Sequence, residues 1–143
     1  MYNKAVGFNS FIFFERIIFM SRSIILPIKP EYTEKILKGT KKYEFRKRAC
    51  REKIDKIYIY ETAPVKKVVA EVSVDEIIKG SPQYIWNICS KYGGINKQKY
   101  DQYFNDSPNA AAYKLGCVKK YEKPKELSDF GVDYVPQSFV YVV

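Results

Sequence analysis

The chain has 143 residues, 46% of them apolar and 29% charged, with a formal net charge of +9 and no histidine. This length favours one globular domain with an ordinary core and leaves too few residues for two. The absence of histidine excludes Ser-His-Asp and Cys-His nucleophile arrangements and every histidine-based metal site. Three widely spaced cysteines, Cys50, Cys89 and Cys117, indicate reduced thiols in a cytoplasmic protein rather than disulfides or a zinc site. We expect no metal and no cofactor.

Residues 1–19 differ in character from the rest of the chain. Their apolar run is interrupted by Glu15 and Arg16, which makes it too short for a transmembrane helix and unlike a signal peptide. We therefore interpret 1–19 as an extension outside the fold, with Met20 as the true first residue and 20–143 as the domain. An amphipathic membrane anchor is the alternative interpretation, although we expect no membrane association.

The first predicted elements are a strand over 23–28 and a helix that begins at Pro30 and ends at Gly39. Proline suits the first turn of a helix, and glycine suits the left-handed position that ends one. Glutamates near the start and lysines near the end of this segment agree with the helix dipole. The helical spacing of Tyr32 and Ile36 predicts the buried stripe.

The segment after this helix predicts a strand with one aromatic face, carrying Tyr43 and Phe45, and one charged face. The charged face would carry Lys42, Glu44, Arg46 and Arg48. Between positions 29 and 56 the chain has 11 basic and 5 acidic residues. Such concentrated positive charge favours a polyanionic partner, such as RNA, DNA or a nucleotide. A solvated face in which Glu44 pairs with Lys42 or Arg46 explains the same charges without a ligand.

The remainder of the chain predicts further strands and two inserted helices. Strands are expected over 57–60, 65–74, 112–121 and 137–143. The last of these has a continuous apolar run, which favours burial on both faces. Ser81 and Asn96 are the predicted N-caps of the two helices, and 122–134 reads as a polar loop. About six strands, one early helix and a helical insertion together predict an α+β fold, a small mixed β-barrel.

A spaced pattern, Gly-x-Lys-x-x-Glu-x-Arg, falls on Gly39, Lys41, Glu44 and Arg46. This pattern, called the hallmark below, resembles the signature of the ASCH domain family of PUA-like β-barrels. Segments 113–116 and 136–139 are also similar to small, stand-alone bacterial members. The resemblance implies a barrel with a cleft beside the hallmark, binding of RNA or a nucleotide-like ligand, and a role in transcription or translation regulation. Because the sequence shows no attached helix-turn-helix or catalytic domain, we also expect a protein partner that supplies context.

The predicted nucleic-acid-binding residues combine the basic segment with the hallmark and with the C-terminal segment of the resemblance. They are Lys29, Lys41, Lys42, Tyr43, Arg46, Lys47, Arg48, Gln137 and Ser138, with Arg51 as a further phosphate contact. Arg46 offers a bidentate hydrogen bond to phosphate or to a base edge, which lysine cannot imitate. The rings of Tyr43, Tyr58 and Tyr60 either stack on bases or pack in the barrel wall.

The resemblance also carries an enzymatic alternative, a small hydrolase with Lys41 and Glu44 as catalytic residues. Some ASCH proteins are amidohydrolases that act on acetylated cytidine through a hallmark lysine, a threonine three residues later and a distant glutamate. Here Glu44 takes the position of that threonine, which leaves Thr40 and Thr62 as substitutes. Ribonuclease activity is a second form of this alternative. A lysine base needs burial or a neighbouring cation to lower its pKa.

Overall fold

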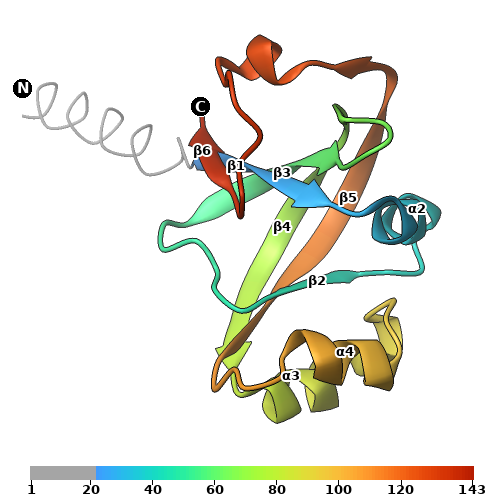
Figure 1. The fold of residues 1–143 in the computed structure, drawn as a ribbon, viewed down its shortest axis with the longest axis vertical. Coiled ribbons are helices and arrows are strands. Elements are labelled where there is room, and N and C mark those ends of the chain that lie inside the picture. The colour runs from blue at the N-terminus through green and yellow to red at the C-terminus, as the bar shows by residue number, and fades with distance from the viewer. Residues whose placement is uncertain (1–21) are drawn as a thin grey trace, which may run out of the picture.

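A computed structural model describes residues 22–143 (Figure 1). The strands are β1 Arg22–Ile28, β2 Tyr43–Arg46, β3 Ile54–Glu61, β4 Lys67–Gly80, β5 Ala110–Lys125 and β6 Val140–Val142. The α-helices are α2 Pro30–Lys38, α3 Pro82–Cys89 and α4 Lys97–Tyr103. Within 22–143, no helix is both long enough and apolar enough to cross a bilayer. The interpretations of 1–19 and of Met20 lie outside the described residues.

The six strands form one sheet in the order β2-β5-β4-β3-β1-β6. β1 runs parallel to β3, and every other pair of neighbours is antiparallel. The prediction of an α+β fold with about six strands is therefore confirmed. Over the described residues, β2 and β6 stay at opposite ends of the hydrogen-bonded order, so the sheet is not closed into a barrel.

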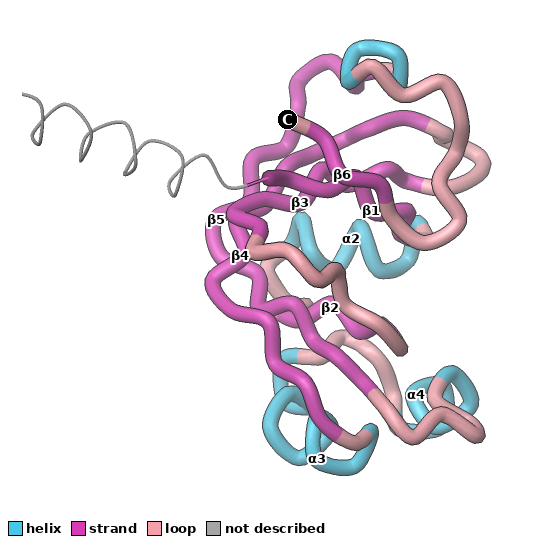
Figure 2. The backbone as a smooth tube through the Cα atoms, turned by 90° about the vertical axis from the view of Figure 1, so that its left-hand side faces the viewer, coloured by secondary structure: helices cyan, strands magenta, loops and turns pink. Residues whose placement is uncertain are grey.

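The two longest strands, β4 and β5, have 14 and 16 residues and carry the helical insertion at their shared end (Figure 1). Figure 2 shows α3 and α4 together at that end, away from β1, β3 and β6. Both predicted caps are confirmed, because Ser81 Oγ accepts from the Tyr84 N–H at 3.1 Å and Asn96 Oδ1 accepts from the Lys99 N–H at 2.8 Å. The β4–β5 pair thus brings α4 to the side of β2.

The early helix and the strand after it form as predicted. Gly39 has φ +82°, and its N–H donates to the Ile36 carbonyl at 3.1 Å, which ends α2. β2 then pairs with β5. The charged side of β2 is not open to solvent, however, and Glu44 is only 6% exposed. On the aromatic side of β2, α4 packs against Phe45, and the Tyr100 ring meets the Phe45 ring edge-on with centroids 5.2 Å apart.

Two predictions at the C-terminal end are wrong. The final strand is only Val140–Val142, and it is not buried on both faces, because two of its three residues are only partly buried. It lies at the edge of the sheet and pairs with β1 alone. Its apolar run is instead accommodated by ring packing, since Phe139 and Tyr141 meet edge-on at 5.3 Å. The expected loop over 122–134 is also partly regular, because β5 extends to Lys125 and a 3₁₀ helix follows.

Candidate functional site

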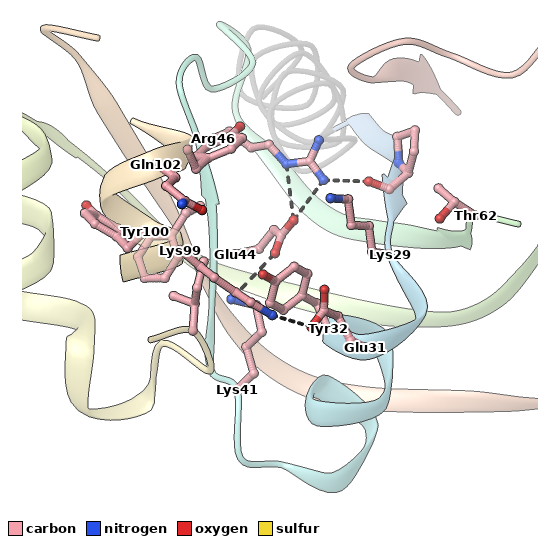
Figure 3. Close-up of a pocket in the computed structure, with 14 residues that line it drawn as sticks. Lys29, Glu31, Tyr32, Lys41, Glu44, Arg46, Thr62, Lys99, Tyr100 and Gln102 are labelled. Atoms are coloured by element: carbon pink, nitrogen blue, oxygen red, sulfur yellow. Dashed lines mark hydrogen bonds and ion pairs between the residues drawn. The ribbon is translucent and has the colours of Figure 1, made fainter. Parts of the chain in front are cut away.

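A pocket of about 590 Å³, the hallmark pocket, lies between α2, β2 and α4 (Figure 3). Its charged lining residues are Lys29, Glu31, Lys41, Glu44, Arg46 and Lys99. Its aromatic lining residues are Tyr32, Phe45, Tyr100 and Tyr103. The pocket thus joins the segment that carries the hallmark to a helix more than 50 residues later in the chain.

Glu44 and Arg46 form the central ion pair of the hallmark pocket. Arg46 donates to Glu44 Oε2 from Nη2 at 2.8 Å and from Nε at 3.2 Å, and Nη2 also donates to the Pro27 carbonyl at 2.6 Å (Figure 3). The predicted pairing of Glu44 with Arg46 is confirmed. Pairing of Glu44 with Lys42 is wrong, because the Lys42 ammonium lies over the Tyr92 ring, 4.8 Å from its centroid. The guanidinium is therefore held in one orientation by two protein acceptors.

Lys41 is buried beside this pair, with only 3% of its surface exposed. Its Nζ donates to the Gly93 carbonyl at 2.6 Å and lies 3.7 Å from Glu44 Oε1. The rings of Phe45 and Tyr32 flank the ammonium, with centroids 4.7 and 5.3 Å away. Burial lowers the pKa of Lys41, and the Glu44 carboxylate opposes that shift only in part. Lys41 is thus a desolvated amine inside a pocket, whereas we expected it, from the sequence, to contact a phosphate.

The loop after α3 packs against the Lys41 side chain and accepts its hydrogen bond, a role that the sequence did not predict. Gly93 supplies the carbonyl acceptor, and Gly94 has φ +65°. A Cβ added at Gly94 would lie 2.6 Å from Lys41 Cβ and 2.8 Å from Cγ, closer than real carbon contacts allow. A Gly-Gly pair after a helix is also a signal that ends the helix. The one signal for its second role was that it has two glycines where one ends a helix.

The aromatic residues of the pocket also differ from those expected. Tyr60 is buried and Tyr58 packs against Phe130 with centroids 4.6 Å apart, so both pack as the alternative interpretation had it. Tyr43 packs at the margin of the apolar cluster around Phe45 and does not line the pocket. The rings that do line it include Tyr32 and Tyr103. Burial raises the pKa of both hydroxyls above the ordinary value for tyrosine.

The predicted nucleic-acid-binding residues are divided between the hallmark pocket and a second cavity of about 820 Å³, called the basic pocket. The hallmark pocket contains Lys29, Lys41 and Arg46. The basic pocket contains Arg46, Lys47, Arg48, Arg51, Gln137 and Ser138. Lys42 and Tyr43 line neither cavity. Segments that are distant in sequence therefore meet, and Arg46 belongs to both cavities.

Of the two threonines considered as nucleophiles, only Thr62 lines the hallmark pocket. Thr40 is exposed, and its hydroxyl donates to the Lys35 carbonyl at 3.3 Å. Over residues 22–143, no three acidic or cysteine side chains gather as a metal site. The chemically distinctive groups of the hallmark pocket are thus the Lys41 amine, the Glu44 carboxylate and the Arg46 guanidinium.

The fold is similar to that of ASCH domains of known structure. The crystal structure of ASCH from Zymomonas mobilis is similar to this chain with a TM-score of 0.76 and 25% identity, covering 85% of this chain and 87% of that one. The chain belongs to the family described as a domain of unknown function, DUF365, whose model matches residues 21–135. The predicted ASCH resemblance is supported, while the assignments to the PUA-like superfamily and to bacterial stand-alone members stay predictions.

Two curated relatives have names that state an activity. An ASCH domain-containing ribonuclease of Zymomonas mobilis is 28% identical over 95 residues, which cover 66% of this chain and 64% of that protein. The ATP synthase subunit alpha of Ureaplasma parvum is 31% identical over 122 residues, which cover 85% of this chain but 15% of that protein. The chain thus spans less than two thirds of the length of either relative.

Proposed function

We propose that this protein binds single-stranded RNA and takes one nucleotide into the hallmark pocket. The observation that carries the proposal is the combination of aromatic rings and fixed positive charge in one cavity of about 590 Å³. Proteins read single-stranded RNA by stacking unpaired bases on aromatic or guanidinium planes while Lys and Arg contact the phosphates. Similarity to a protein named as an ASCH domain-containing ribonuclease supports RNA as the ligand.

Each part of the hallmark pocket has a role in this proposal. Tyr32 on α2 and Tyr103 on α4 offer ring faces for a base. Lys29 is exposed at the rim and contacts a phosphate. Glu44 and Arg46 present a carboxylate and a guanidinium whose positions are fixed by their mutual hydrogen bonds, so a base edge meets a preorganised acceptor and donor.

The test is a salt titration of the full-length chain binding a fluorescent single-stranded RNA, with the matching DNA and a free nucleotide as competitors. We expect log affinity to fall linearly with log salt concentration, because phosphate contacts release counterions. Arg46→Ala is expected to weaken binding at least about tenfold, because it removes the one cation that lines both cavities, whose Nη1 donates to no acceptor within the described residues. Lys120→Ala on β5, which lines neither cavity, is the control. Absence of RNA binding even at low salt would contradict the proposal.

A regulatory role in transcription or translation, in the cytoplasm and with a protein partner, is a further part of this proposal. It depends on RNA binding, because the similarity that supports it concerns RNA. Co-purification of RNA and of a defined partner with the natively expressed protein tests this part. If RNA co-purifies but no protein partner does, the regulatory part of the proposal fails and RNA binding by the domain alone remains.

A second candidate function is RNA cleavage with Lys41 and Glu44 as catalytic residues, favoured by the lowered pKa of the buried Lys41 amine. The neutral amine would take the proton of a ribose 2′-hydroxyl, whose oxygen then bonds to the adjacent phosphorus. The bond from phosphorus to the 5′ oxygen of the next nucleotide breaks, and that oxygen takes the proton back from the ammonium. Glu44 would hold Lys41 and Arg46 in position, and Arg46 would face the phosphate charge.

Cleavage of an amide in a modified nucleoside is the other form of this candidate. Thr62, the one threonine among the residues that line the hallmark pocket, would then be the nucleophile. Incubating the protein with RNA and with acetylated cytidine distinguishes the two forms by their products. Lys41→Met, which keeps an unbranched stem and removes the amine, is expected to abolish either activity. Lys42→Met, at the exposed neighbouring position, should leave it unchanged. Finding no product from either substrate would remove the enzymatic candidate and leave the binding proposal intact.

A further inference from the structure

The basic pocket adjoins the hallmark pocket, and the two share Arg46 and Tyr103 as lining residues. Its charged residues are Arg22, Arg46, Lys47, Arg48, Arg51 and Glu52. Five of these six side chains are basic, whereas the hallmark pocket has four basic and two acidic lining residues. The basic pocket therefore has the larger excess of positive charge.

The charges of the two cavities also differ in their partners. In the hallmark pocket Lys41 and Arg46 pair with Glu44, and Lys99 pairs with Glu31 at 3.3 Å. In the basic pocket Arg22 pairs with Glu52, but Lys47, Arg48 and Arg51 have no carboxylate within 4.0 Å anywhere in the part of the chain that the structure describes. Unpaired cations that line a concave surface attract an anionic ligand more strongly than paired ones do.

The backbone that carries these cations is anchored on either side of Arg51. The Cys50 N–H donates to the Tyr113 hydroxyl at 2.9 Å, and the Glu52 N–H donates to the Tyr141 hydroxyl at 3.1 Å. Cys50 itself is 1% exposed, so the loop between β2 and β3 is tied to the core between Arg48 and Arg51. Side chains on an anchored loop lose less conformational freedom when they bind a ligand.

The boundary between the two cavities is itself suited to a nucleotide chain. The Lys47 ammonium lies 5.4 Å from the centroid of the Tyr103 ring, and Arg46 lines both sides. A polynucleotide that leaves the hallmark pocket past this ring meets Arg46 first and the unpaired cations of the basic pocket next. A free nucleoside in the hallmark pocket would leave those cations without a ligand.

We propose that the basic pocket binds the phosphates of nucleotides adjacent to the one held in the hallmark pocket, so that the ligand is an oligonucleotide rather than a free nucleotide or nucleoside. This inference rests on the proposed function and defines its substrate class. The observation that carries it is that Arg46 and Tyr103 line both a largely ion-paired aromatic cavity and a basic cavity with three unpaired cations.

The experiment compares two probes on the full-length chain: a mixed-sequence RNA octamer, followed by fluorescence anisotropy, and the nucleoside 5′-monophosphates, followed by calorimetry. The double variant Arg48→Ala/Arg51→Ala removes two cations from the basic pocket alone. Lys120→Ala/Lys123→Ala makes the same change of charge on β5, outside both cavities. Lys29→Ala reports on the hallmark pocket alone.

We expect the Arg48/Arg51 variant to lose at least about tenfold in octamer affinity while its mononucleotide affinity stays unchanged. The negative slope of log affinity against log salt concentration should become shallower by about 1.4, because each lost phosphate contact on a single strand accounts for about 0.7. Lys29→Ala should weaken both probes, and the β5 control neither.

An unchanged octamer affinity and salt slope in the Arg48/Arg51 variant would overturn the inference, provided that the wild-type chain binds RNA. Equal losses for octamer and mononucleotide would also overturn it, since the basic pocket would then act on the nucleotide site itself. If the wild-type chain binds neither probe, the proposed function fails and the inference fails with it. The two failures are thus distinguished by the wild-type measurement.

Discussion

The hallmark pocket and the basic pocket share the lining residue Arg46, but their ion pairs differ in how far they are buried. Arg46 and Glu44 have side chains that are 19% and 8% exposed, and each satisfies the other. The corresponding pair of the basic pocket, Arg22 and Glu52, has both side chains 50% exposed. Solvent therefore weakens the second pair and barely reaches the first.

This difference separates two functions of charged residues. A buried pair has a high desolvation cost and fixes the orientation of its groups, so its value lies in position. Exposed, unpaired cations contribute long-range attraction that salt screens. We infer that the hallmark pocket determines what is recognised or changed, while the basic pocket determines how strongly an anionic chain is drawn in.

The largest expected effect is the difference in stability between removing Glu44 from the hallmark pocket and removing Glu52 from the basic pocket. Glu44→Ala should lower the free energy of unfolding by about 3 kcal/mol, because it leaves the buried Lys41 and Arg46 cations without their partner. Glu52→Ala should lower it by about 0–1 kcal/mol, as for other exposed pairs. Urea denaturation measures both. Losses of equal size would mean that burial does not distinguish the two cavities.

The next prediction concerns the close contact between Gly94 and the Lys41 side chain. Gly94→Ala and Gly39→Ala both place alanine at positive φ, at +65° and +82°, which costs about 1 kcal/mol at either position. Only at Gly94 does the added Cβ meet the Lys41 side chain, whereas no atom lies within 4 Å of it at Gly39. We expect Gly94→Ala to cost about 1 kcal/mol more than Gly39→Ala in thermal or urea unfolding. Identical costs would show that Lys41 shifts freely.

A smaller effect concerns pH. Because burial lowers the pKa of Lys41 below its ordinary value of 10.5, the unfolded chain binds more protons than the folded one between those two values. The Lys41 contribution to the free energy of unfolding therefore rises with pH through that window. Lys41→Met removes this rise, so the stability of wild type relative to Lys41→Met should increase from neutral pH toward pH 10.5. A constant difference would contradict a lowered pKa.

The smallest effect is expected from the pair at the mouth of the hallmark pocket. Lys99 on α4 and Glu31 on α2 meet at 3.3 Å, and their side chains are 53% and 47% exposed. A double-mutant cycle with Lys99→Ala and Glu31→Ala should give a coupling of about 0–0.5 kcal/mol that vanishes at high salt. A larger, salt-resistant coupling would place this pair with the buried network instead of with the exposed charges.

Features set by neighbouring residues were predicted from the sequence. The Pro30 start and Gly39 end of α2, the caps at Ser81 and Asn96, and the strand that carries the hallmark all depend on groups within about one turn of the chain. The edge position of β6 was not predicted. A short apolar run reads the same whether a sheet continues beyond it or ends there.

Three residues that line the hallmark pocket were singled out from the sequence, but their arrangement was not predicted. Lys41, Glu44 and Arg46 follow from the hallmark, yet the sequence did not show that Lys41 is desolvated. Burial of Lys41 depends on the Gly93 carbonyl, which is 52 residues away. Tyr103 likewise lines the pocket only because of where α4 packs.

By itself, the sequence determined the elements, the hallmark and the local excess of positive charge, because these depend on spacing and composition. Only the tertiary structure decided which charges are buried and which are exposed. The long β4–β5 pair carries the α3–α4 insertion to the side of β2, where the Gly93 carbonyl and the rings of Tyr32 and Phe45 surround Lys41. Arg48 and Arg51 stay at the surface. Desolvation depends on all surrounding atoms, so no pattern within the hallmark could have fixed it.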